Sequence, residues 1–153
     1  MTTQTRHVTK SELALELGRS MTELRNHLRQ YIQVKIKEHG INITFEMLEV
    51  MACLWKKDGI NQQELADLTL RDKSSMTYLL DNLVKRKMVK RVEDENDRRN
   101  KLIYLTKEGK DLREQLQPWV AEVYEMASVD ADINDLKSSL LLIKKMINNL
   151  KKT

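Results

Sequence analysis

The strongest constraint on the fold is a change of hydrophobic pattern within one stretch of the chain, residues 61–106. A short segment that Asn61 can cap is followed by a turn and by an amphipathic segment that Asp72 can cap. Two segments rich in β-branched and aromatic residues come next, residues 88–93 and 101–105, separated by the polar residues 94–100. This order predicts a helix, a turn, a second helix of residues 73–86 and then a β-hairpin.

Apolar and polar side chains lie on opposite faces of the second predicted helix. The apolar side chains fall at helical spacing and are expected to face a core: Met76, Leu79, Leu80 and Leu83. The other face gathers small hydrogen-bonding groups, an amine and a phenol at the helix start: Lys73, Ser74, Ser75, Thr77 and Tyr78. Such groups can read base edges in a major groove, where the first residues of a recognition helix make contact. An ordinary solvated face is the alternative interpretation.

The predicted hairpin favours nucleic acid as the partner. Its tip carries the pair Arg98 and Arg99, and a wing of this kind can place a guanidinium in a minor groove. The charge distribution agrees with this prediction. Residues 71–110 hold 12 Lys/Arg and 7 Asp/Glu, whereas the rest of the chain holds 15 and 16, so the net charge of +4 comes from this segment. A local positive excess is typical of a surface that binds a polyanion.

These motifs together resemble the MarR family of bacterial winged helix-turn-helix transcription regulators. The residues that carry the resemblance are Leu65-Ala66 through Leu83, Val89, Arg91, Asp97-Arg98-Arg99 and Leu105-Thr106-Lys107-Glu108-Gly109, and it extends over nearly the whole chain. The resemblance implies a homodimeric repressor that binds a pseudo-palindromic operator in double-stranded DNA and is released by a small effector. It also implies that Arg99 enters the minor groove and that the Asp97 carboxylate orients it by accepting a charge-assisted hydrogen bond. Arg98 either shares that role or holds a phosphate, and Lys85 and Arg86 are expected to contact phosphates.

Two residues depart from the pattern of the family. Lys87 stands where the family commonly has glycine after the recognition helix, and Glu95 stands where many members have proline in the wing. If the backbone at Lys87 has positive φ, a lysine there costs strain.

Long helices are expected on both sides of the DNA-binding centre. Residues 1–153 are read as a single MarR-type domain, with residues 44–105 as the winged-helix lobe and residues 10–40 and 106–152 as dimerisation helices. Each flank carries an apolar stripe: Leu13, Leu17, Met21, Leu24, Leu28 and Ile32 first, then Ile133, Leu136, Leu140, Ile143, Ile147 and Leu150. These stripes predict an intersubunit bundle, with packing on the chain's own core as the alternative.

Three further apolar faces are predicted to point inward. They are Phe45, Leu48, Met51, Ala52 and Trp55 in a helix capped by Thr44, then Leu65 and Leu68, and finally Leu112, Leu116, Trp119, Val120 and Val123. Pro118 lies inside the last of these helices, where a proline is expected to cause a kink.

Composition narrows the classes of protein. One proline and four glycines favour a mostly helical fold, no apolar run reaches the roughly 20 residues of a membrane span, and MTTQTRHVTK lacks a signal core. We therefore expect a cytoplasmic protein that does not contact a membrane. The histidines and the single Cys53 have no metal-ligand spacing and there is no glycine-rich phosphate loop, so neither an enzyme, a metal site nor a cofactor is expected. A redox role for Cys53 is the less favoured interpretation of that thiol.

A small aromatic effector is implied by the resemblance alone. His27, Tyr31, Met47, Met51 and Trp55 could line a cleft for it between the dimerisation helices and the lobe, although Met and aromatic residues at this spacing are more often core. An alternative in a different functional class is a helical adaptor whose winged helix binds protein rather than DNA.

Overall fold

The computed structural model describes residues 6–153. Residues 1–5, the first part of the segment that lacks a signal core, lie outside the described residues. Helices predominate and a hairpin follows the second helix of the lobe, as the sequence predicts, and a third short strand completes the sheet. The elements in chain order are α1 (Lys10–Glu38), α2 (Phe45–Lys56), β1 (Ile60–Asn61), α3 (Gln62–Leu68), α4 (Lys73–Lys85), β2 (Val89–Glu93), β3 (Lys101–Leu105), α5 (Lys107–Ala127) and α6 (Ile133–Lys151). They divide into two units, residues 1–120 and residues 121–153.

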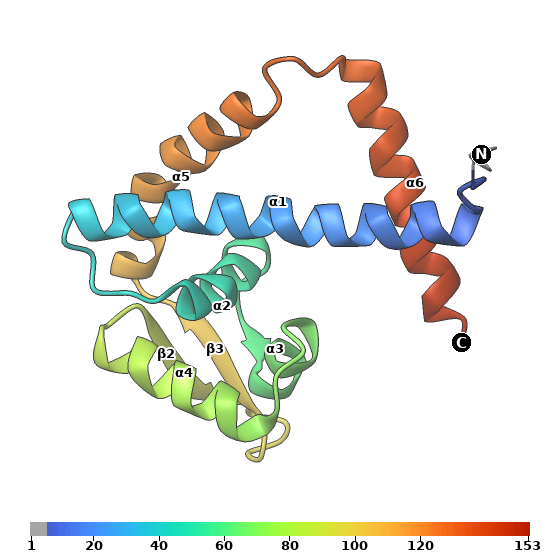
Figure 1. The fold of residues 1–153 in the computed structure, drawn as a ribbon. Helices are drawn as coiled ribbons and strands as arrows, with labels where there is room; N and C mark the ends of the chain where they lie inside the picture. Colours follow the sequence, from blue (N-terminus) through green and yellow to red (C-terminus); the bar gives the residue numbers. More distant parts are fainter. Residues whose placement is uncertain (1–5) are drawn as a thin grey trace. The chain divides into compact units, whose positions relative to one another are not determined.

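The first unit contains the winged-helix lobe. Its antiparallel sheet has the order β1-β3-β2, and α2, α3 and α4 pack around it (Figure 1). In the hairpin, Val89 pairs with Leu105 and Glu93 with Lys101. The core between helices and sheet is made by the largest fully buried side chains: Val50, Met51, Leu54, Leu65, Met76, Leu80, Leu83 and Ile103. The predicted inner face of α4 is confirmed, because Leu79 is buried as well.

Three helices of this unit end in the same hydrogen-bonded turn. After α4, the Lys87 N–H donates to the Val84 carbonyl at 2.9 Å and the Met88 N–H to the Leu83 carbonyl at 3.0 Å. This pair of bonds is a Schellman motif, which needs a left-handed residue just past the helix end. The same pattern follows α1 and α3, and the left-handed residues are Gly40 (φ 63°), Leu70 (φ 52°) and Lys87 (φ 58°). The positive φ anticipated at Lys87 is therefore confirmed.

The junction before α5 explains the Leu-Thr-x-x-Gly motif. Thr106 caps α5 by accepting a hydrogen bond from the Gly109 N–H at 3.1 Å, and its hydroxyl also donates to the Lys87 carbonyl. A Cβ on Gly109 would lie 2.2 Å from the Met88 carbonyl oxygen. The start of α5 is thus joined directly to the segment that follows the recognition helix, and only glycine permits this approach.

Three residues predicted to be internal are exposed. Leu68 is 59% exposed, Val120 is 40% exposed, and Ala52 is exposed as well. Leu65 and Ala66 are the buried residues of α3, and at about 100° per residue Leu68 points roughly 110° away from the direction midway between them. The three-residue spacing of Leu65 and Leu68 therefore predicted that both lie on one side of the helix, but it did not locate the centre of the buried stripe.

The second unit contains α6 and the end of α5. Asp132 caps α6 by accepting a hydrogen bond from the Asn134 N–H at 2.7 Å. No residue of α6 is buried, and Leu140 and Leu150 are 53% and 74% exposed. Helix α5 continues through Pro118, and the expected kink stays a prediction. Within residues 6–153, no helix is long and apolar enough to cross a membrane.

Candidate nucleic-acid interface

Helix α4 begins at a well-formed cap. The Asp72 carboxylate accepts a hydrogen bond from the Ser75 N–H at 2.7 Å. This bond is the largest of the effects that hold the pKa of Asp72 below its ordinary value. The carboxylate is therefore ionised at neutral pH, where it also complements the positive end of the helix. Lys73, Ser74, Ser75 and Tyr78 lie exposed on the first two turns, Tyr78 by 68%.

Thr77 differs from the other predicted base-reading residues. Its hydroxyl donates to the Lys73 carbonyl and accepts from the Gln62 side chain of α3, both at 2.9 Å. The single proton of this hydroxyl is already donated, so Thr77 must give up the bond to Lys73 before it can donate to a base. The assignment of Thr77 to the major groove stays a prediction, but the structure gives this side chain a role inside the lobe.

Lys85 and Arg86 occupy the other end of the helix. Lys85 is exposed in the last turn, whereas the Arg86 guanidinium is bound by the protein. Its Nε donates to the Asn42 carbonyl at 2.7 Å, and its Nη1 donates to the Asn82 carbonyl and side chain at 3.1 Å. Arg86 thereby joins the end of α4 to the segment between α1 and α2, and its predicted phosphate contact has to coexist with these bonds.

The tip of the wing is ordered by Asp97, through the backbone. Its carboxylate accepts a hydrogen bond from the Arg99 backbone N–H at 3.0 Å, and its carbonyl accepts from the Asn100 N–H at 2.9 Å. The predicted bond to a guanidinium is not the bond observed. Arg98 and Arg99 are exposed at the tip. At the base of the loop, Glu93 pairs with Lys101 at 2.7 Å. The hydrogen bond from Lys101 is the largest of the effects that lower the pKa of Glu93.

One groove brings the wing and the recognition helix together. Its volume is about 380 Å³, and its lining includes Arg99 and Lys101 of the wing, Lys73 of α4 and Gln62 of α3. Two residues from the predicted minor-groove and major-groove sets, Arg99 and Lys73, therefore line a common concave surface. A groove with three cationic side chains is suited to a polyanion.

Comparison with known proteins agrees with this geometry. Residues 43–101 match the model of the MarR family. The HTH-type transcriptional regulator MhqR of Bacillus subtilis is 30% identical over 120 residues, which are 77% of this chain and 78% of MhqR. This chain belongs to the MarR family of transcription regulators. Another family relative, the transcriptional activatory protein BadR of Rhodopseudomonas palustris, is 27% identical over 94% of this chain and 83% of BadR.

Solved MarR structures share the fold over most of their length. A MarR transcriptional regulator from Methanosarcina mazei Go1 superposes with a TM-score of 0.78 at 27% identity, covering 89% of this chain and 96% of that one. A mutant of E. coli MarR complexed with operator DNA superposes with a TM-score of 0.74 at 21% identity, covering 91% and 99%. The second likeness is one of fold alone.

The residues predicted to line an effector cleft lie in different surroundings, and Met47 among them lines a pocket between α2 and α4. Met51 has no exposed surface and Met47 is 3% exposed, so both belong largely to the core of this MarR lobe. The Trp55 indole N–H donates to the Gly109 carbonyl at 2.9 Å, and His27 is exposed on α1. Lys35 lies over the Tyr31 ring, with its Nζ 5.5 Å from the ring centroid. The effector cleft stays a prediction, and the Met51 side chain is enclosed in this structure.

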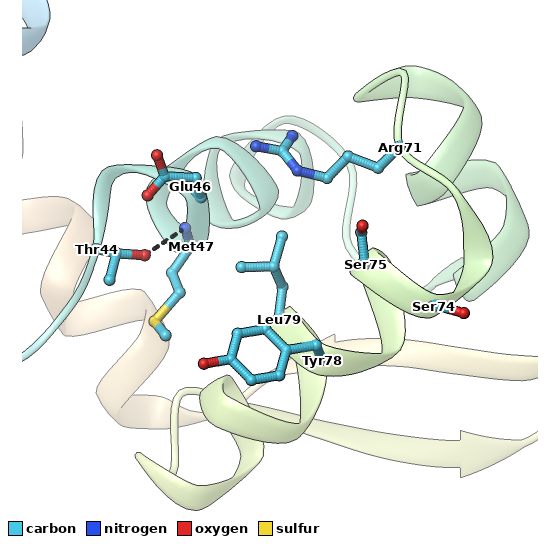
Figure 2. A pocket seen from close by; sticks show the side chains of 8 residues that line it. All are labelled: Thr44, Glu46, Met47, Arg71, Ser74, Ser75, Tyr78 and Leu79. Atoms are coloured by element: carbon cyan, nitrogen blue, oxygen red, sulfur yellow. Dashed lines mark hydrogen bonds between the residues drawn. The ribbon is translucent and has the colours of Figure 1, made fainter.

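A pocket that sequence reasoning missed lies between α2 and α4. Its volume is about 600 Å³, and its lining is Thr44, Glu46, Met47, Arg71, Ser74, Ser75, Tyr78 and Leu79. Figure 2 shows Glu46 and Arg71 on one side of the pocket and Tyr78 and Leu79 of α4 on the other. Three of the eight residues belong to the predicted DNA-reading face. No spacing rule could have revealed the pocket, because its two walls are separate helices.

A bridging carboxylate connects α1 to the helix-turn-helix. Glu49 of α2 pairs with Arg25 of α1 and, at 2.9 Å, with Arg71, the residue before the α4 cap. Both Glu49 and Arg71 are largely buried, with side chains 22% and 18% exposed. The sequence shows these charges but not their partners, since 24 and 22 residues separate them.

Cys53 lies half-buried on α2 and is free. Burial, and secondly the negative charge of Glu49, raises the pKa of its thiol. The thiolate is the reactive form, so a raised pKa favours the unreactive thiol at neutral pH. Among residues 6–153, no group of three or more His, Cys, Asp or Glu side chains is arranged to hold a metal ion.

Proposed function

We propose that this MarR-family chain acts as a homodimer that binds a pseudo-palindromic operator in double-stranded DNA. Each recognition helix enters a major groove through Lys73, Ser74, Ser75 and Tyr78, and each Arg99 enters an adjacent minor groove. Lys85 and Arg86 contact phosphates, and Arg98 either shares the role of Arg99 or holds a phosphate. The observation that carries this proposal is the groove of about 380 Å³, which Lys73 and Arg99 line together. A reader of two neighbouring grooves needs such a juxtaposition.

The dimer is supported by exposed apolar side chains on α1 and on α6. Helix α6 buries none of its residues, and along α1 Leu13 and Leu24 are 57% and 50% exposed. Several large apolar side chains are exposed on each of these helices, and exposed apolar patches typically mark an interface between proteins. We therefore propose that residues 1–153 form one MarR-type domain, in which the helices of residues 10–40 and 106–152 hold two chains together.

Repression by promoter occlusion is the proposed mode, with release by a small aromatic effector. The pocket of about 600 Å³ supports the effector, because Ser74, Ser75 and Tyr78 are shared between it and the DNA-reading face. A bound molecule there would compete with DNA for the same side chains. The name of BadR describes an activator, so the sign of regulation needs its own test, which is transcription from the selected operator with and without the protein. A cytoplasmic location belongs to the proposal, since a free thiol suits a reducing compartment.

The test is selection of bound duplexes from a random pool, followed by titration of the winning sequence across a salt series. An inverted repeat should be enriched, and log K should fall linearly with log salt as phosphates are neutralised. Light scattering of the complex should give two chains for each duplex. If no sequence is enriched and the affinity for duplex does not depend on salt, the adaptor hypothesis replaces this one.

Matched variants separate the two kinds of contact. Lys73→Met should cost roughly 1–3 kcal/mol on the operator and relax specificity at particular base pairs. Lys85→Met should weaken binding to all sequences alike and reduce the salt slope by about one. Lys56→Met removes the same charge from the exposed end of α2 and serves as the control. Equal effects of all three variants would contradict the assignment of base-reading and phosphate-binding roles.

A further inference from the structure

One side of the recognition helix is bound to the wing rather than free to read DNA. Asp81 lies one turn beyond Thr77 on α4, and its carboxylate pairs with the Arg91 guanidinium of β2 at 2.7 Å. The same Nη2 of Arg91 lies 3.5 Å from the Thr77 carbonyl, which it approaches as a donor. A guanidinium presents several donors in a rigid plane, so it can hold two acceptors of one helix turn in a fixed direction.

The position of Arg91 along β2 gives these contacts their importance. Val89 starts the strand as a buried residue, whereas Val92 and Glu93, which lead toward the tip, are exposed. The contacts of Arg91 with α4 therefore lie on the tip side of the buried start of the strand. Beyond them the hairpin carries Asp97 to Arg99 out to the predicted minor-groove contact.

We propose that Arg91 and Asp81 form a clamp that positions the wing relative to the recognition helix, so that both reach their grooves in one docking. This inference rests on the proposed function and adds two positioning residues to it. The pair is half-exposed, with side chains 27% and 52% exposed, and pairs of this kind contribute little to folding stability. Removing the Arg91–Asp81 pair should therefore leave the lobe folded. The resulting loss of operator affinity cannot exceed the affinity that the wing contributes.

The experiment compares two variants that lose the same charge from the same strand. Arg91→Met keeps an apolar stem of similar length but loses the clamp, and Lys90→Met removes the exposed neighbouring cation. On the selected operator, Arg91→Met should bind about 3- to 10-fold more weakly than Lys90→Met, up to the roughly tenfold effect expected for losing a wing arginine. Methylation protection in the major groove should persist, while hydroxyl-radical protection at the flanking minor grooves should fade. Equal affinity and equal footprints for the two variants would overturn the clamp.

Asp81→Ala tests the direction of the effect. It removes an acid beside the DNA-reading face, so simple electrostatics predicts tighter binding. The clamp predicts weaker binding with the same loss of minor-groove protection, and tighter binding would refute it. The exchanged pair Asp81→Arg/Arg91→Asp should restore part of the protection. Arg91→Met and Arg99→Ala should also be non-additive, because both disable the same wing, and full additivity would contradict the shared role.

A measurement without DNA separates this inference from the proposed function. Amide exchange in residues 94–100 should be several-fold faster in Arg91→Met than in Lys90→Met, with unchanged thermal unfolding, because the wing loses its attachment to α4. If wild type enriches an operator but the two variants exchange and bind alike, the clamp alone is wrong. If wild type enriches no sequence, the proposed function fails and the positioning role fails with it. If Arg91→Met loses major-groove protection over specific bases instead, Arg91 contacts DNA itself and is not a clamp.

Discussion

Replacing Lys87 by glycine should stabilise the protein. Lys87 is exposed and holds φ at 58° in the turn after the recognition helix. An L-residue in this left-handed region costs roughly 1–2 kcal/mol, and glycine avoids that cost. Glycine in turn loses more conformational entropy on folding, about 0.5–1 kcal/mol. The difference predicts a net gain of about 0.5–1 kcal/mol, because every bond that the structure shows at this position uses backbone atoms that glycine retains.

Thermal unfolding followed by circular dichroism measures the gain. For a chain of this size 1 kcal/mol shifts Tm by about 2–4 °C, so Lys87→Gly should raise Tm by roughly 1–4 °C. The comparison has to be made at one chain concentration, since association also shifts Tm. Lys87→Ala is the matched control because it removes the same charge and side chain while keeping the left-handed penalty. If Lys87→Gly melts at or below the temperature of Lys87→Ala, the backbone strain assigned to this turn is refuted.

Four further outcomes follow from the structure. Gly109→Ala should lower stability by about 1–3 kcal/mol in denaturant titration, because its Cβ would meet a backbone carbonyl. The pKa of Asp72 is lowered in the folded protein, so the carboxylate contributes its full stabilisation at pH values above 3.8, the ordinary pKa. This stabilisation is lost as the pH falls through the lower pKa of the folded state, and Asp72→Asn should therefore flatten the decline of Tm in acid. Leu140→Glu/Ile143→Glu should give monomers by light scattering and abolish operator binding, whereas a monomeric wild type at micromolar concentration would contradict the dimer. Cys53→Ser should leave operator affinity insensitive to peroxide, as in the parent; release of DNA by peroxide in the parent alone would show a redox role.

Local hydrogen bonds explain why the helix starts were predictable. The predicted caps Thr44, Asn61 and Asp72 each join a side chain to a backbone N–H three residues further on. Such a bond depends on residues that stand together in the sequence, so residue type and position are enough to predict it. The same holds for the buried face of α4, which follows from helical spacing.

The helix ends show where this local logic fails. Gly40 signals the turn after α1, but the equivalent turns after α3 and α4 contain Leu70 and Lys87, which carry no such signal. Packing of the lobe therefore imposes a left-handed conformation that the residue type disfavours. Partners across elements were equally unpredictable, because the sequence shows Arg25, Glu49 and Arg71 as charges without indicating which of them meet.

The paired arginines change how the charge of the DNA-binding segment has to be interpreted. Residues 71–110 have a net charge of +5, from 12 cations and 7 acids, but Arg71 and Arg91 are held by carboxylates. Arg98 and Arg99 are exposed at the tip. Counterion release depends on the phosphates that are neutralised, and a guanidinium already paired with an acid adds little to it. The salt slope should therefore follow the exposed cations of α4 and the wing rather than the composition of the segment, while the paired arginines fix the geometry in which those cations meet DNA.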